Sequence, residues 1–230
     1  MPSEYYTADG FDGTADGPLW ASARRHLRAL LAVFLLVSAV VTALAAAFDL
    51  TAVAPSSVLP VDLSPRPQSG FRLAVEVGTL AGAFAAAIVL VGAVGRDARV
   101  SLSRGRRQAA VAPVAFAVAA VCGRVALPHV VGAVASASGR PVLDAYWAAE
   151  VWLFFPVALG AAAATPFLLA AAVRAGVVGR YTSTRQRGYA ALAFVAFAAC
   201  YSPPDGATFV LFAAPLFAGL AAGVAWLEFR

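Results

Sequence analysis

Charge is scarce in this chain of 230 residues, and lysine is missing altogether. Asp, Glu, Lys and Arg make up only 13% of the residues, whereas 61% are hydrophobic. A soluble globular domain is typically about a quarter charged and about half apolar. The composition therefore excludes an ordinary soluble domain and predicts an integral membrane protein.

Cysteine and histidine are also nearly absent, which removes the commonest metal ligands and nucleophiles. We interpret Cys122 and Cys200, which lie within apolar segments, as small core residues rather than as a disulfide or a metal site. His26 and His129 stand alone. We find no glycine-rich phosphate loop and no nucleophile elbow. The sequence therefore predicts neither an enzyme nor a cofactor site.

Six apolar segments follow a polar start. Residues 1–18 are rich in acidic and small residues and predict a disordered tail, and residues 19–230 predict one membrane domain. A spanning helix needs about 20 apolar residues. The first four segments meet this length, whereas the fifth, with 14 residues, reaches only about 21 Å of a ~30 Å hydrocarbon core. The predicted spans are Leu27–Phe48, Phe71–Val94, Ala109–Val134, Ala145–Val173, Gly188–Tyr201 and Thr208–Trp226.

The arginines predict how these spans are oriented. Most of the 17 fall on one side of a six-span chain, and loops rich in arginine face the cytoplasm. We therefore expect a multi-pass protein of the cell membrane with both termini in the cytoplasm. Because the arginines lie in short loops between apolar runs, they indicate contact with a bilayer and not with nucleic acid. Those on the cytoplasmic side are Arg24, Arg25, Arg28, Arg96, Arg99, Arg104, Arg106, Arg107, Arg174, Arg180, Arg185, Arg187 and Arg230.

Three ionisable residues fall inside the predicted spans: Glu76, Arg124 and Glu150. A charge within the bilayer costs at least ~2.5–3.5 kcal/mol on insertion scales, so such residues need partners. Counting the helical rise places all three near one level in the outer half of the membrane. We hypothesise an ion cluster around Arg124. Alternatively, Glu76 pairs with Arg72 one turn away and Glu150 extends to the interface.

Glycines and prolines predict local contacts and turns. Gly78-x-x-x-Gly82 and Gly219-x-x-x-Gly223 have the spacing of close helix contacts, although this spacing arises easily in a chain rich in Ala and Gly. Pro203 and Pro204 predict a rigid outer turn after the fifth segment, since proline fixes φ and lacks a donor. Asp205 then caps the last helix, and Pro215 predicts a kink within it. The turn residues Pro203, Pro204 and Asp205 follow Ser202 directly.

The order of features in the tail resembles the TatC family, the membrane core of the twin-arginine protein translocase. A basic step ending in Tyr189, a short helix, the Ser-Pro-Pro-Asp turn and a helix with an early proline match the last third of that family. The segment Ser103-Arg104-Gly105-Arg106-Arg107 resembles its basic loop, and Arg24 resembles an arginine of its amino-terminal motif.

The resemblance implies a cupped six-helix bundle that is a receptor and scaffold for exporting folded proteins with the proton-motive force. It also implies three kinds of partner: twin-arginine signal peptides, single-span Tat subunits of the TatA and TatB type, and other TatC copies. The expected cytoplasmic face carries Arg24, Arg104, Arg106 and Arg107.

This chain departs from the family pattern where that pattern has acidic or polar residues. Ser22 and Gly105 stand at the two positions whose glutamates receive a signal peptide, and Ala164 replaces a polar residue of the fourth helix. An alternative is therefore a divergent TatC paralogue that lacks signal recognition and serves as an assembly or regulatory partner. A third alternative is a small permease or ion-handling protein built on Glu76, Arg124 and Glu150.

Overall fold

The computed structural model describes residues 18–48, 50, 61–62, 69–97, 102–138, 143–177, 184–202 and 206–229. These residues form helices and one short pair of parallel strands. The helices are α1 (Pro18–Arg25), α2 (Leu27–Ala46), α3 (Ser69–Asp97), α4 (Leu102–Ser138), α5 (Ala145–Ala175), α6 (Thr184–Tyr201) and α7 (Gly206–Glu228). The strands are β1 (Val61–Asp62) and β2 (Leu143–Asp144).

The helical prediction is confirmed, and each apolar segment lies within a helix, except that the first, Leu27–Phe48, runs two residues past the end of α2. By length and composition, α2, α3, α4, α5 and α7 can each cross a membrane, and α6 contributes a shorter apolar stretch, Arg187–Tyr201. The helices extend beyond the apolar runs, so residues predicted as loop, such as Arg106 and Arg107, lie in the first turns of α4. Hydropathy detects only the apolar part of a helix, whereas arginine is a good helix former and continues it.

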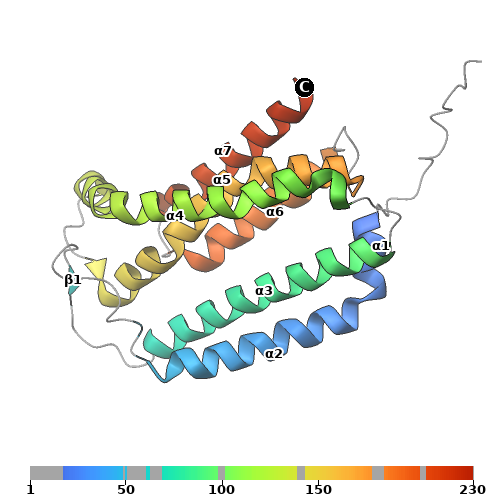
Figure 1. Cartoon of the computed structure of the whole chain (residues 1–230). Coiled ribbons are helices and arrows are strands. Elements are labelled where there is room, and N and C mark those ends of the chain that lie inside the picture. The colour runs from blue at the N-terminus through green and yellow to red at the C-terminus, as the bar shows by residue number, and fades with distance from the viewer. Residues whose placement is uncertain are drawn as a thin grey trace, which may run out of the picture.

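The helices α2 and α3 form an antiparallel pair along one side of the molecule (Figure 1). Gly78 and Gly82 allow this pair to approach closely. A Cβ atom at either glycine would lie less than 3 Å from α2, against Ser38 and Thr42 or against Ser38 and Phe34. The spacing noted in the sequence is therefore a real backbone contact, because only glycine leaves room for the neighbouring helix.

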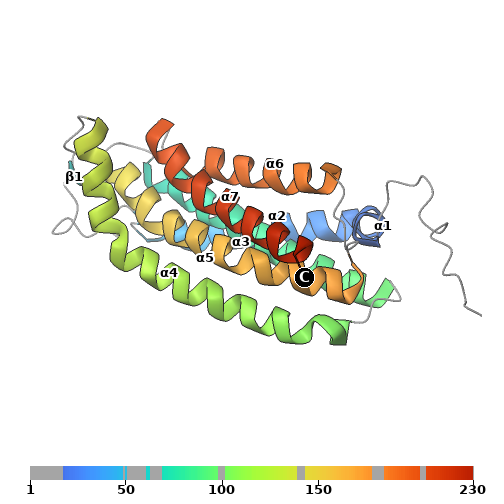
Figure 2. The ribbon, with the colours of Figure 1, turned by 90° about the horizontal axis from the view of Figure 1, so that it is seen from above.

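Helix α5 is the centre of the other group and packs between α4 and α7 (Figure 2). Its side chains Phe154 and Phe155 are buried, and Phe155 contacts Phe212 of α7 with ring centroids 5.8 Å apart. Gly219 of α7 faces the Ala162 carbonyl of α5 so closely that a Cβ would collide with it. This confirms the second glycine pair as a helix contact. Large apolar side chains also cover the outer surfaces of α2, α3 and α4, as expected of helices that meet lipid.

Helix α3 joins this group through its first half. Leu73 and Ala74 are fully buried, and Thr79 Oγ1 lies 3.1 Å from Tyr201 Oη of α6. Helix α1 packs against α3 near the opposite end of the molecule. The junction of α3 with α5 and α6 therefore lies at one end of the molecule, and the contact of α1 with α3 lies at the other.

Candidate functional site

A polar cluster of Arg72, Glu76, Tyr146 and Glu150 lies where α3 meets the start of α5. Glu76 Oε1 accepts a hydrogen bond from Tyr146 Oη at 2.6 Å and an ion-paired hydrogen bond from Arg72 Nε at 3.1 Å. The Arg72 guanidinium also lies 4.9 Å from the centre of the Tyr146 ring. The Glu76 side chain is only 11% exposed, so these two partners compensate a charge that is largely removed from solvent.

Glu150 lies one turn beyond Tyr146 and is fully buried, at 0% exposure. It does not extend to the interface as the simpler interpretation of the sequence had it. It follows Tyr146 by four residues on α5, so the two side chains lie on the same side of that helix. Because Tyr146 bonds Glu76, the structure brings both predicted acidic residues, Glu76 and Glu150, to the junction of α3 and α5.

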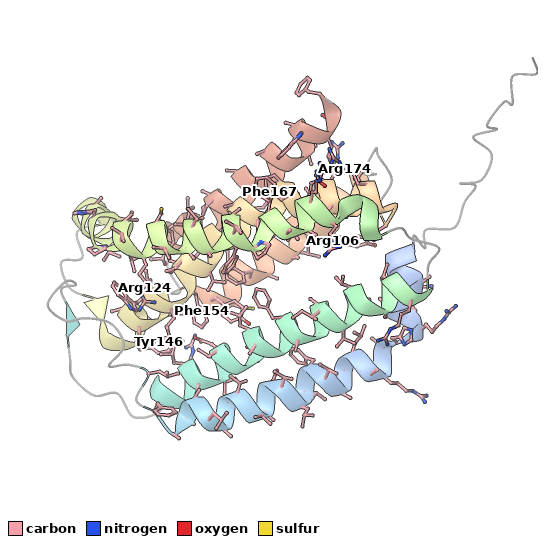
Figure 3. All side chains as sticks on the ribbon, in the orientation of Figure 1. Arg106, Arg124, Tyr146, Phe154, Phe167 and Arg174 are labelled. Carbon is pink, nitrogen blue, oxygen red and sulfur yellow. The ribbon has the colours of Figure 1, made fainter. Side chains whose placement is uncertain are left out.

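Arg124 does not organise this cluster. Its side chain is exposed, and its guanidinium lies 4.6 Å from the centre of the Trp152 ring, a cation–π contact. Figure 3 shows Arg124 beside α5, on the α4 side. Among the described residues, Arg124 forms no ion pair with Glu76 or Glu150. The predicted cluster around Arg124 is wrong, because Arg72 reaches Glu76 within one helical turn while Arg124 meets an aromatic face.

The sequence analysis did not identify Tyr146 as a partner. Its hydroxyl connects α5 to α3, and its position four residues before Glu150 places both on one side of α5. That spacing was the available signal. The link to Glu76 was not readable, because residues 76 and 146 are separated by 70 positions in the chain.

The opposite end of the molecule is strongly basic. The start of α4 lies there beside the ends of α3 and α5, with α1 close by (Figures 1 and 2). Among the acidic side chains that the structure describes, only Glu228 belongs to this end, and it pairs with Arg187. We call this the basic end and define it by its exposed arginines: Arg24, Arg25, Arg28, Arg96, Arg106, Arg107 and Arg174.

Three of the four arginines predicted for the cytoplasmic face are exposed at the basic end: Arg24 on α1, and Arg106 and Arg107 on α4. Arg104 belongs to the first turn of α4, but its side chain lies outside the described residues. Figure 3 shows Arg106 on the side of α4 that faces α3. The fold therefore gathers basic groups that the sequence distributes over more than 80 positions.

The residues predicted to shape the last two helices are only partly visible. Tyr189 is exposed on α6, and Pro215 lies inside α7 and is half-buried. The turn Pro203, Pro204 and Asp205 lies outside the described residues. The rigid turn, the cap and the kink stay predictions.

A model of the family described as Sec-independent protein translocase protein (TatC) matches residues 20–215. The chain belongs to the TatC family. No curated protein and no solved structure was found to match it. As a TatC-family protein it is a multi-pass membrane protein and a component of the Sec-independent translocase, which serves protein transport and not catalysis. Its partners in general are the other parts of that translocase.

In this TatC protein, the positions that resemble the family's signal-binding glutamates are small and buried. Ser22 is 3% exposed on α1, which packs against α3. Gly105 faces α5, and a Cβ atom there would lie 2.6 Å from the Ala171 carbonyl oxygen. Ala164 is buried within α5. A glutamate at position 105 would therefore require α4 and α5 to separate.

Proposed function

We propose that this protein is a membrane-core subunit of the twin-arginine translocase in the cytoplasmic membrane, a scaffold for exporting folded proteins with the proton-motive force. The observation that carries the proposal is the TatC match over residues 20–215, which runs from α1 into α7. We take residues 1–18 as a separate acidic tail and residues 19–230 as the membrane domain.

We propose six spans, in which the short helix α6 crosses the membrane in addition to the five longer helices. Helix α6 is short, but its neighbours support it: Tyr201 contacts Phe154 of α5 with ring centroids 4.9 Å apart, and its hydroxyl meets Thr79 of α3. A short span held by neighbouring helices can thin the bilayer around it at modest cost. With six spans and the basic end in the cytoplasm, both termini are cytoplasmic. The cupped shape of the bundle is what the resemblance to the TatC family implies.

The basic end is then the face that meets cytoplasmic and membrane partners. We propose that single-span Tat subunits of the TatA and TatB type, and further TatC copies, assemble on this bundle. In the receptor form of the proposal, twin-arginine signal peptides bind at Arg24, Arg104, Arg106 and Arg107. That form requires an acidic group from elsewhere, since a guanidinium is best paired with a carboxylate.

A second candidate function is supported by Ser22 and Gly105. Both are buried in helix contacts, and the exposed charge around them comes from arginines. Such a surface repels a twin-arginine motif. The protein would then be a TatC paralogue without signal recognition that assists a complete TatC. The permease alternative stays a less favoured hypothesis, because Arg124 contacts the Trp152 ring rather than a carboxylate.

Site-specific photo-crosslinking separates the two. A photo-reactive residue is placed at position 24, 106 or 107 in turn, in membranes that contain the Tat subunits, and a twin-arginine signal peptide is compared with its twin-lysine control. Crosslinks that vanish with twin lysine establish a receptor. No selective crosslink, together with co-purification of single-span Tat subunits or another TatC, establishes the partner role. Loss of both crosslinking and co-purification refutes the translocase assignment.

A further inference from the structure

An apolar groove of about 330 Å³ lies near the basic end, between the second half of α3, the start of α4 and the end of α5. Its walls are small and aliphatic, with Leu90 and Val91 from α3, Ala109 from α4, and Leu168 and Ala172 from α5. Val91 and Leu168 are more than half exposed, so the groove opens to the surroundings of the helices. We call it the α3–α5 groove. Its volume is within the ~300–1,000 Å³ of small-molecule sites.

Exposed arginines lie at the same end of the molecule as the groove, and one of them is adjacent in sequence to a lining residue. Gly105 lines the groove, and Arg106 follows it on the side of α4 that faces α3 (Figure 3). Arg96 and Arg174 are exposed at the same end of the molecule. The one described carboxylate of the basic end, Glu228, pairs with Arg187 on other helices. An occupant of matching chemistry therefore has an apolar body and an anionic head.

We propose that the α3–α5 groove holds one anionic phospholipid, with an acyl chain between α3 and α5 and its phosphate on Arg106. Basic pockets between transmembrane helices bind anionic head groups in this way. Arginine forms charge-assisted, often bidentate, hydrogen bonds to phosphate. The proposal goes beyond the role in translocation and requires only that the chain spans a bilayer.

The size and lining of the groove favour a lipid chain over a peptide. An α-helix about 10 Å wide with a 1.5 Å rise occupies roughly 120 Å³ per residue, so about 330 Å³ holds less than one turn. An extended peptide would place its N–H and C=O groups against aliphatic side chains, which leaves them without partners at a cost of several kcal/mol in a membrane. A hydrocarbon chain has no such groups.

The test is native mass spectrometry of the full chain, titrated with palmitoyl-oleoyl phosphatidylglycerol or with phosphatidylcholine of the same chains. We expect one phosphatidylglycerol to bind more tightly than phosphatidylcholine. Arg106→Ala should weaken phosphatidylglycerol about tenfold, the equivalent of one charge-assisted hydrogen bond. Arg107→Ala is the matched control: it removes the same charge from the adjacent position, 100° around the helix, and should cost less.

Filling the groove tests the acyl chain separately. Val91→Trp and Leu168→Trp place bulk in the groove at exposed positions, so the fold should tolerate them, and each should remove the one tightly bound lipid. Val118→Trp, equally exposed on α4 but away from the groove, should not. Thermal unfolding of each variant verifies that it is folded.

Three results would overturn the proposal. They are equal affinity for the two lipids, unchanged binding in both groove-filling variants, and a signal-peptide segment that crosslinks at Val91 while lipid binding is unaffected. None of these readouts depends on protein export. A failure here is therefore distinct from a failure of the translocase assignment.

Discussion

The hydrogen bond from Tyr146 of α5 to Glu76 of α3 should contribute measurably to the free energy of unfolding. It is 2.6 Å long, and the acceptor side chain is 11% exposed. Hydrogen bonds to charged groups contribute about 1.5–3 kcal/mol in soluble proteins, whereas interhelical bonds in membranes average about 0.6 and reach about 1.7 kcal/mol. We therefore expect Tyr146→Phe to lower the free energy of unfolding by about 1–1.5 kcal/mol.

A double-mutant cycle isolates this bond. Tyr146→Phe and Glu76→Met are made singly and together, and the free energy of unfolding is measured by reversible denaturation in mixed micelles. The coupling energy should be about 1 kcal/mol, since Tyr146 is the partner that Glu76 finds on another helix. The double variant should be less damaged than the sum of the single variants, because neither polar group is then left unpaired.

The matched control is the cycle between Arg124→Ala and Glu76→Met. Arg124 lies over Trp152, so these two losses should add to within about 0.5 kcal/mol. Additive losses for Tyr146 and Glu76, or a clear coupling between Arg124 and Glu76, would refute the partner assignment drawn from the structure. The second outcome would reinstate the cluster around Arg124 that the sequence suggested.

Three further predictions concern helix contacts. Gly78→Ala should destabilise by about 1–3 kcal/mol through overpacking against α2, whereas Gly92→Ala on the same helix has open space and should be neutral or stabilising by up to about 1 kcal/mol; equal thermal shifts would contradict this. Gly105→Glu should lower the yield of monodisperse folded protein and add no twin-arginine crosslinking, because the Ala171 carbonyl occupies the space; a stable variant that gains selective crosslinks would disprove the account. Arg187→Ala should change the thermal midpoint little, since its pair with Glu228 is exposed and such pairs contribute about 0–1 kcal/mol; a large loss would show a role beyond that pair.

The sequence by itself determined the class of this protein. The lengths of the apolar segments give the helices, because a bilayer requires long unbroken apolar runs with all backbone groups bonded internally. The arginine-rich loops predict the basic end, and the order of features in the tail indicates the TatC family, as the family match then showed. The Arg72–Glu76 pair was also available as an alternative, because partners four residues apart on one helix meet whatever surrounds them.

Only the tertiary structure decided which helix faces meet. In a soluble helix an apolar stripe reveals the buried face, but here both the core side and the lipid side are apolar, so the rotation of each helix is not encoded in hydropathy. That rotation places Tyr146 on Glu76, Arg124 on Trp152 and Gly105 against Ala171. Each of these contacts joins residues at least 28 positions apart, and it depends on the register of two helices rather than on any local pattern.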